Sequence, residues 1–361
     1  MDYPDAISEA NFTTRGSGFS PARVCGAALI AVFILLGATA SHASCSYAVS
    51  APSLGIAAAG GNLTMSIQTG SDCAWSIFGL PAWLTVSGSS EGIGSAEVTV
   101  VAGDNPGPAR IGAFTVAGVS VPVRQLDSSA CPEGTGCLIR PLPHIAFGGV
   151  WTTEIFAVSW AKRESDLSIA FYSDDGSPVA VPLTGGFGRV NTLTDNIPAL
   201  GRRDYEVRDA SAPIQSGWAL VTAGSSVETQ AVFRNAAPSG NYYEAAVQRG
   251  EAYSHFLIPF DVTTITPTGR PLYTAFAIAN LNPLVMANVV CTARDASGTV
   301  IQNALTIPGL KPLGHYAGYL SGPLTGRRGT LDCNADTLVS AIALRLIGDE
   351  AFSTLPVILP D

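Results

Sequence analysis

The sequence predicts an all-β protein, in which a small N-terminal β-sandwich is followed by two related β-sandwich modules. Three observations predict this fold class. Many short segments alternate apolar and polar residues with the two-residue period of a half-buried strand. The chain contains 38 glycines and 24 prolines, which supply tight turns between such strands. The second part of the chain also repeats itself, as expected of duplicated modules.

The first element is an apolar N-terminal segment. Gly26–Ala40 (GAALIAVFILLGATA) is uncharged, and Ser41-His42-Ala43 follows with the small-x-small pattern of cleavage before Ser44. A second such site is Ala38-Thr39-Ala40. The alternative is a retained membrane anchor. The uncharged apolar run from Val24 to Ala40 is only 17 residues, however, at the lower end of the ~17–25 that span a bilayer. We expect residues 1–43 to be a signal peptide, and the protein to be secreted or placed at the cell surface, touching a membrane only through an uncleaved signal segment.

Charge argues against nucleic acid as a partner. The chain has a net charge of −9, and its basic residues form no cluster larger than pairs such as Arg202-Arg203 and Arg327-Arg328. Binding to a phosphate backbone therefore has no electrostatic basis. Only 13% of the residues are charged, about half the usual ~25%.

Six cysteines remain after the signal segment, and an even number in an exported chain predicts disulfides. The pairing does not follow from the number, because six cysteines allow ~15 connectivities. A metal site is disfavoured, because the sequence has no C-x-x-C pair and only His144, His255 and His315 remain in the mature chain. We expect no metal and no cofactor. The six cysteines are Cys45, Cys73, Cys131, Cys137, Cys291 and Cys333.

The N-terminal module is predicted from alternating strands. Asn62–Thr69 places Leu, Met and Ile on one side of a two-residue period, and Ala96–Ala102 alternates in the same way. Ile111–Val116 and Val119–Val123 flank Ala117-Gly118 as a hairpin. The short spacing between these strands favours an antiparallel sandwich.

Residues 45–125 carry an ordered set of motifs: Cys45-Ser-Tyr47, Gly60-Gly61, Cys73-Ala-Trp75, Trp83-Leu-Thr-Val86, Asn105 and the hairpin Arg110–Gln125. On these motifs, the segment shows a resemblance to the BACON domain family. It implies an immunoglobulin-like β-sandwich over residues 45–126, near the N-terminus of an exported bacterial protein. It also implies a Cys45–Cys73 disulfide and suggests carbohydrate binding, a property inferred for the family from the enzymes it accompanies.

The internal repeat defines two further modules, residues 142–250 and 251–361, after a linker at 127–141. Four segments of the first copy align with four of the second. The aligned pairs are Thr153–Val158 with Thr274–Ala279, Asp174–Gly176 with Asp295–Gly298, Ile197–Leu200 with Ile307–Leu310, and Ala231–Arg234 with Ile342–Arg345.

The repeat also predicts a disulfide. Cys291 and Cys333 align with the apolar residues Ala170 and Val221, which suggests one inward-facing position on each of two strands, filled by Ala and Val in the first copy and bridged by sulfur in the second. This leaves Cys131 and Cys137 to close the CPEGTGC turn in the linker.

The search for catalytic chemistry is negative. Ser90 lies in a G-x-S-x-G sequence, but no helical pattern follows it, so a hairpin loop is favoured over a nucleophile elbow. Asp174 and Asp175 precede a glycine, as turn residues do. His144 and His255 each precede an apolar stretch at matching points of the two copies, which favours a repeated residue at the start of a strand. We expect no catalytic residues.

Exposed aromatic rings are the remaining candidates for ligand binding. Trp75 shares a strand face with Cys73 and is predicted to be core. Trp83 follows Pro81 and is the more plausible surface ring, although core packing is favoured there too. Tyr242, Tyr243 and Tyr253 form a second cluster near the junction of the two copies, and the alternative is that they only pack this junction. The candidate ligand-binding residues are therefore Trp83, Tyr242 and Tyr243, in a non-enzymatic exported protein that binds carbohydrate or a surface protein; the alternative is a structural spacer or interaction scaffold.

Overall fold

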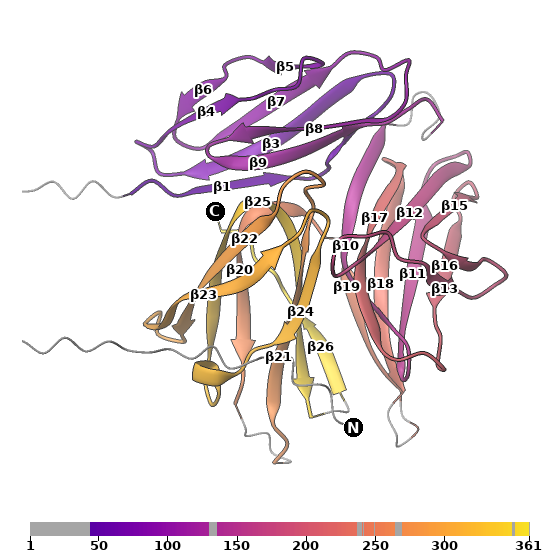
Figure 1. Ribbon diagram of the computed structural model, residues 1–361, viewed down its shortest axis with the longest axis vertical. Helices are drawn as coiled ribbons and strands as arrows, with labels where there is room; N and C mark the ends of the chain where they lie inside the picture. Colours follow the sequence, from indigo (N-terminus) through magenta and orange to yellow (C-terminus); the bar gives the residue numbers. More distant parts are fainter. Residues whose placement is uncertain are drawn as a thin grey trace, which may run out of the picture. The chain divides into compact units, whose positions relative to one another are not determined.

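The structure is a computed structural model that describes residues 44–129, 136–236, 240, 242–248, 250–263, 269–348 and 351–360. It confirms the all-β prediction: the described residues form strands and one short 3₁₀ turn, η1 (Gly322–Leu324), and no α-helix (Figure 1). The strands fall into three consecutive groups, which we call the N-terminal, middle and C-terminal modules.

The N-terminal module, indigo to violet in Figure 1, has two antiparallel layers. One layer has the order β5-β7-β3-β1, and the other β6-β4-β8-β9, with β2 beside β9. The predicted hairpin forms at Ala117 and Gly118, which both have positive φ. The strands are β1 (Tyr47–Ala51), β2 (Gly55–Ile56), β3 (Gly61–Thr69), β4 (Ala74–Phe78), β5 (Leu84–Ser87), β6 (Glu91–Ile93), β7 (Ala96–Ala102), β8 (Arg110–Val116) and β9 (Val119–Gln125).

The middle module also has two sheets, of order β10-β17-β12-β15 and β14-β13-β16-β11-β18-β19. Alternating residues of both sheets form one core, which includes Ile155, Ile169 and Val221. Its strands are β10 (Cys137–Phe147), β11 (Trp151–Ser159), β12 (Ser165–Ser173), β13 (Val181–Leu183), β14 (Gly188–Val190), β15 (Thr192–Ile197), β16 (Arg202–Val207), β17 (Gln215–Gly224), β18 (Val227–Ala236) and β19 (Tyr242–Gln248).

The C-terminal module is organised by β25, a strand of 20 residues. The first part of β25 pairs with β20 and β22, and its second part pairs with β21 and β26. Both of its faces are buried from Leu338 to Leu344. The strands are β20 (Ala252–Asp261), β21 (Leu272–Asn280), β22 (Ala287–Asp295), β23 (Val300–Leu310), β24 (His315–Tyr319), β25 (Arg328–Ile347) and β26 (Ala351–Leu355).

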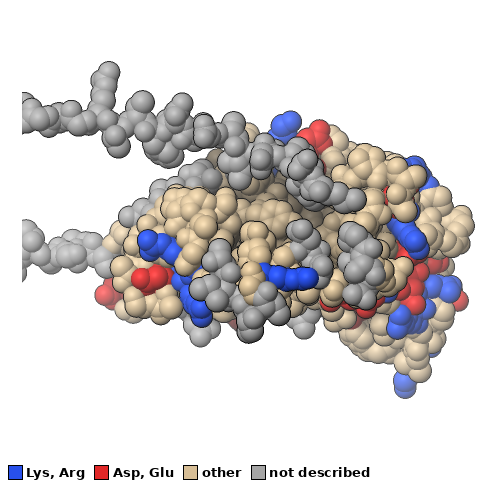
Figure 2. Space-filling view, turned by 90° about the horizontal axis from the view of Figure 1, so that it is seen from below, with Lys and Arg blue, Asp and Glu red and all other residues tan. Residues whose placement is uncertain are grey.

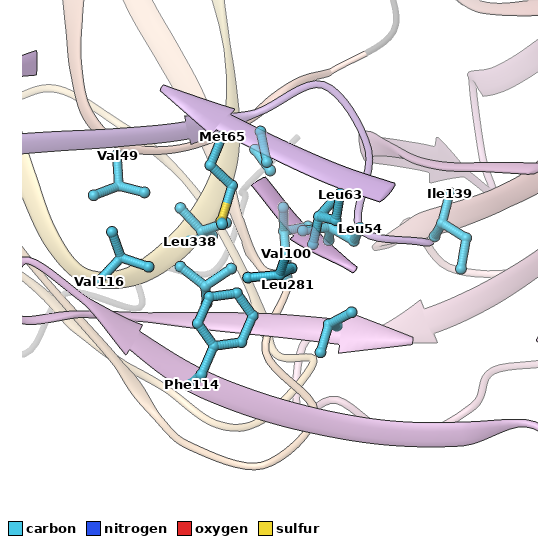
Figure 3. Close-up of a cluster of buried hydrophobic side chains, with 14 of the residues drawn as sticks. Val49, Leu54, Leu63, Met65, Val100, Phe114, Val116, Ile139, Leu281 and Leu338 are labelled. Atoms are coloured by element: carbon cyan, nitrogen blue, oxygen red, sulfur yellow. The ribbon is translucent and has the colours of Figure 1, made fainter. Parts of the chain in front are cut away.

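The core of the N-terminal module continues into the other two. Figure 3 shows Met65 and Phe114 of the N-terminal module together with Ile139 of β10, and with Leu281 and Leu338 of the C-terminal module. Strand β10 already begins at Cys137, so the last part of the expected linker 127–141 is strand. The reason is burial, because Ile139 packs directly on Gly55, where a Cβ would approach its side chain to 2.5 Å.

A second apolar cluster joins the middle and C-terminal modules. Phe233 of β18 and Val247 of β19 pack on Ile342 and Leu344 of β25. These two residues lie on the face of β25 opposite to Ala341 and Ala343, which belong to the C-terminal module's own core. The second part of β25 is therefore covered on both sides, as its unbroken burial requires.

Candidate functional site

The outer face of the six-stranded sheet β14-β13-β16-β11-β18-β19 presents the most distinctive surface of the described residues. Successive side chains of a strand point to opposite faces. Ile155 and Ala157 of β11 point into the core, whereas Glu154, Phe156 and Val158 point outward. Figure 2 shows charged side chains of both signs crowded at the right of the view, the side where Figure 1 places β11, β13 and β16.

Ion pairs link neighbouring strands across this outer face. Arg234 of β18 contacts Glu154 of β11 at 2.9 Å and also contacts Glu244 of β19. The hydrogen bond with Glu244 raises the pKa of the Arg234 guanidinium. Arg202 lies over the Phe156 ring at 4.4 Å. The cations of this face are thus matched by carboxylates or by an aromatic ring beside them.

A hollow of about 420 Å³ opens at one end of the outer face. Tyr242, which is 66% exposed, stands at its wall beside Glu244, because β19 pairs with β18 in the register Tyr242 to Ala236 and Glu244 to Arg234. Arg208 and Glu206 line the hollow from the segment at β16, 4.0 Å apart. The volume lies in the ~300–1,000 Å³ range of small-molecule pockets.

An exposed tryptophan marks the opposite end of β11. Trp160 is 56% exposed, next to the exposed Val158, and its backbone is fixed, because its N–H donates to the Ser226 carbonyl at 3.0 Å. Sequence analysis missed this residue. The signal was available, since Trp160 continues the outward alternation of β11 and directly precedes the charged stretch Lys162–Glu164.

Trp83, the first predicted ligand-binding residue, is not an open platform. It is half-buried against the N-terminal core, and the Arg110 guanidinium covers its ring at 4.7 Å. Gly112 lies beside the ring, where a Cβ would come within 3.3 Å of it. Trp75 is buried, as predicted, and its indole N–H donates to the Gly94 carbonyl at 2.9 Å.

The three predicted tyrosines do not form one cluster. Tyr242 is exposed in the hollow, and Tyr243 is half-buried next to it in β19. Tyr253, in β20, is buried in the C-terminal module, where its hydroxyl accepts a hydrogen bond from the Ala341 N–H at 2.7 Å. Burial raises the pKa of the Tyr253 hydroxyl. Tyr253 therefore has a packing role, and Tyr242 alone keeps an exposed ring.

Two predicted disulfides are present, Cys45–Cys73 and Cys291–Cys333. Cys131 lies outside the described residues, so the predicted Cys131–Cys137 pair does too.

The alignment behind the Cys291–Cys333 prediction is wrong by one residue. Val221 pairs with Ile169, and both are buried in the middle module's core. Ala170 pairs with Leu220 and faces the N-terminal core. A one-residue shift moves a side chain to the other face of the sheet, so Ile169, not Ala170, takes the inward position.

The candidate catalytic groups have structural partners. Ser90 precedes β6, so a strand, and not a helix, follows the G-x-S-x-G sequence. Asp175 accepts hydrogen bonds from the Ser173 hydroxyl at 2.6 Å and from the Ser177 N–H at 3.0 Å, and these hold its pKa at about 2. Asp295 makes the same kind of turn with Ser297. Asp174 and Asp175 both lie in the turn after β12, as predicted.

The two histidines of the repeat have different environments. His144, within β10, contacts His315, whereas His255, within β20, contacts Asp332 at 2.8 Å. Neither begins its strand. The prediction of a repeated residue at the start of a strand is therefore wrong, because His144 and His255 both lie inside their strands.

No protein-family model and no curated protein matches the sequence. Among the described residues, no helix has the length and apolar character needed to cross a membrane. The same residues contain no group of three or more His, Cys, Asp or Glu side chains arranged to hold a metal ion.

Proposed function

We propose that the chain is an exported, non-enzymatic protein that binds carbohydrate, and that the hollow at Tyr242 holds the saccharide. The observation that carries this proposal is an exposed aromatic ring beside paired Arg and Glu side chains in a hollow of ligand size. An aromatic face packs against the C–H face of a sugar ring, because both faces are apolar. The tyrosine hydroxyl at the edge of the aromatic ring can also hydrogen-bond. Carboxylates accept hydrogen bonds from sugar hydroxyls, and guanidinium groups donate to them.

The preferred ligand is uncharged. Arg234 contacts Glu244, and Arg208 lies near Glu206, so each cation of the hollow has its own carboxylate. An acidic sugar would compete with these carboxylates for the two guanidinium groups and would lie beside like charges, which disfavours its binding. A neutral saccharide can instead hydrogen-bond to the outer atoms of both pairs.

The modular arrangement behind this function is itself a proposal. We infer that the middle and C-terminal modules are duplicated sandwiches. Their strands pair in corresponding orders: β10-β17-β12-β15 in the middle module corresponds to β20-β25-β22-β23 in the C-terminal module. Aligned threonines also make the same contact: the Thr153 hydroxyl bonds the backbone of Ala146, and the Thr274 hydroxyl bonds that of Asp261. The immunoglobulin-like BACON assignment of the N-terminal module rests on the motifs of residues 45–125 alone.

Export is supported by sulfur chemistry. Disulfides persist in oxidising compartments and are rare in the cytosol, and the described residues form two of them. The apolar segment before Ser44, read as a signal peptide, gives the route. Secretion or display at the cell surface follows from both together.

A second function has its own support. The N-terminal core contains residues of all three modules, including Ile139 and Leu338, which favours a stiff spacer or interaction scaffold over independently moving domains. Such a scaffold needs no ligand in the hollow at Tyr242.

Glycan binding can be tested on the secreted protein. A panel of neutral and acidic glycans is screened, and the best ligand is titrated by calorimetry against the parent and Tyr242→Ala. We expect at least a tenfold loss of affinity, about 1.4 kcal/mol, with an unchanged melting temperature. The matched control is Tyr273→Ala, because Tyr273 is also partly exposed but lies on β21. If the parent retains no glycan, the scaffold function replaces this one. If the parent binds glycan and Tyr242→Ala binds it as well as the parent does, the saccharide does not lie in the hollow at Tyr242.

A further inference from the structure

Three titratable side chains meet where the middle and C-terminal modules touch. His315, at the start of β24, has a fully buried side chain. Its Nδ1 lies 2.7 Å from Asp174 Oδ1, in the turn after β12, and its Nε2 lies 3.1 Å from Nδ1 of His144 in β10. The two imidazoles stack with centroids 5.1 Å apart. Two of the three groups belong to the middle module and one to the C-terminal module, so the chain of contacts crosses the junction.

The loop that carries His315 fits closely onto the middle module. The His315 N–H donates to the Asp174 carbonyl at 3.0 Å, and the buried Trp218 indole donates to the Leu313 carbonyl at 2.7 Å. Gly176 faces the Pro312 carbonyl, where a Cβ would approach to 2.0 Å. Each of these contacts depends on the loop staying in place, and the histidine chain is the one that can change its charge near neutral pH.

One hydrogen lies between the two imidazoles. The line between His144 Nδ1 and His315 Nε2 has room for one hydrogen, so one nitrogen donates and the other accepts. Protonating both rings would point two N–H groups at each other and place two cations in contact inside the junction. Burial and the nearby His315 hold the pKa of His144 well below its usual 6.5. His144 is therefore neutral while the loop is docked.

Protonation of His144 must then favour release of the loop from the middle module. His144 in the docked state binds a proton less readily than the freed side chain does, so the docked state is stable above pH 6.5 and loses stability as the pH falls below it. For one proton, the equilibrium constant for release rises by up to tenfold per pH unit in this window.

The surrounding groups do not replace this behaviour. From β17, the Ser216 hydroxyl lies 3.3 Å from Asp174, and from β18 the uncharged Phe233 ring contacts His144. Asp175 is held by its own turn, and Lys311, at the start of the docked loop, acts on Asp175. Among the described neighbours, these are the charged and polar groups that the contacts place around the histidine pair.

We propose that His144, His315 and Asp174 form a pH-sensitive latch, which holds residues 311–315 on the middle module at neutral pH and releases them in acid. The latch is independent of any ligand in the hollow at Tyr242. It gives an exported protein a response to acidification of its surroundings, through the junction of two modules.

The test is hydrogen exchange measured by NMR on the full mature protein. Protection factors of the Trp218 indole N–H and the His315 amide are determined at pH 7.5, 6.5 and 5.5. They should fall by up to tenfold between pH 6.5 and 5.5, after correction for the intrinsic exchange rate. In His144→Phe, which keeps an aromatic ring but carries no proton, they should be independent of pH.

His255→Phe is the matched control, because it removes another histidine that lies within a strand but contacts Asp332 and none of the latch residues, so it should keep the parent's response. If His144→Phe does not fold, the imidazole Cε1 shifts of the parent protein are titrated directly. Equal protection at pH 7.5 and 5.5 in the parent overturns the latch. An acid response that persists in His144→Phe, or a His144 that titrates at its ordinary pKa while protection stays constant, overturns it as well.

Discussion

The tryptophans show how strongly environment, rather than residue type, decides the role of a side chain. Trp218 is completely buried, stacked on Tyr172 with ring centroids 5.1 Å apart, and hydrogen-bonded across a module junction. Trp83 is half-buried under a guanidinium, and Trp160 is exposed on a fixed backbone. A ring can bind a ligand by stacking only where one face is free, so of these three only Trp160 has the required exposure.

Trp83→Ala should destabilise the fold without affecting ligand binding. The substitution removes the packing on the N-terminal core and Gly112 and the cation–π contact with Arg110. We expect a loss of about 1–3 kcal/mol in the free energy of unfolding, less than the ~3–5 kcal/mol of a fully buried ring. Urea denaturation measures the loss, and glycan titration measures binding.

Phe78→Ala is the control for this prediction, because Phe78 is the exposed aromatic residue of β4 in the same module. It should change stability by no more than about 0.5 kcal/mol. A Trp83→Ala protein that is as stable as the parent and has lost glycan affinity would show that Trp83, and not Tyr242, is the binding ring.

Trp160→Ala examines how far the saccharide extends. Trp160 and Tyr242 stand near opposite ends of the same sheet face, separated by about the length of β11, roughly 30 Å at ~3.3 Å per residue. A short oligosaccharide held at Tyr242 should not reach Trp160, so its affinity should be unchanged in the variant. A long linear glycan should bind about tenfold more weakly. Calorimetry with oligosaccharides of increasing length distinguishes the two results.

Strands with one buried face could be predicted from sequence, whereas β25 could not. In β3, Leu63, Met65 and Ile67 alternate with outward residues, and the period gave the strand directly. The second part of β25 reads Leu-Val-Ser-Ala-Ile-Ala-Leu from Leu338 to Leu344, without alternation. That pattern is explained by strands of the other modules: β18 and β19 cover Ile342 and Leu344, and the N-terminal core covers Leu338. Such non-local burial is invisible to a local pattern.

The candidate site was predicted only in part, for the same reason. Tyr242 was identified as an aromatic residue near a module boundary. Its partners Arg208 and Arg234 come from separate strands, and the register that brings Glu244 beside Arg234 is fixed by the pairing of β18 with β19. The junction of His144 and His315 could not be inferred at all, because 171 residues separate them in the chain.

Removing the Cys291–Cys333 disulfide should weaken the C-terminal module. The two cysteines are buried partners on β22 and β25, 42 residues apart in sequence. In the loop-entropy description, their bond stabilises the fold by roughly 4 kcal/mol. The double variant Cys291→Ala/Cys333→Ala should lose about that much in urea denaturation, and Cys45→Ala/Cys73→Ala slightly less, because its loop is shorter. An unchanged free energy of unfolding for the first double variant would contradict the prediction.

At the scale of the whole molecule, the three modules share apolar cores in addition to the polar contacts around His315. The N-terminal core takes Ile139 and Trp218 from the middle module and Leu281 and Leu338 from the C-terminal module. The modules' sheets are also hydrogen-bonded to one another, because β1 pairs with β20. Separating any module would expose these residues, so the described chain from Cys45 onward should behave as one cooperative unit.

Leu338→Ala tests this cooperativity. Leu338 belongs to β25 but is fully buried in the core built mainly by the N-terminal module. Truncating it should cost about 2–5 kcal/mol and shift a single calorimetric transition of the oxidised protein to lower temperature. The control Val290→Ala, at an exposed position of β22, should leave the transition where it is. Two resolved transitions, with one unmoved by Leu338→Ala, would mean that the modules fold independently. In that case the shared core would not couple them, and the scaffold function would lose its physical basis.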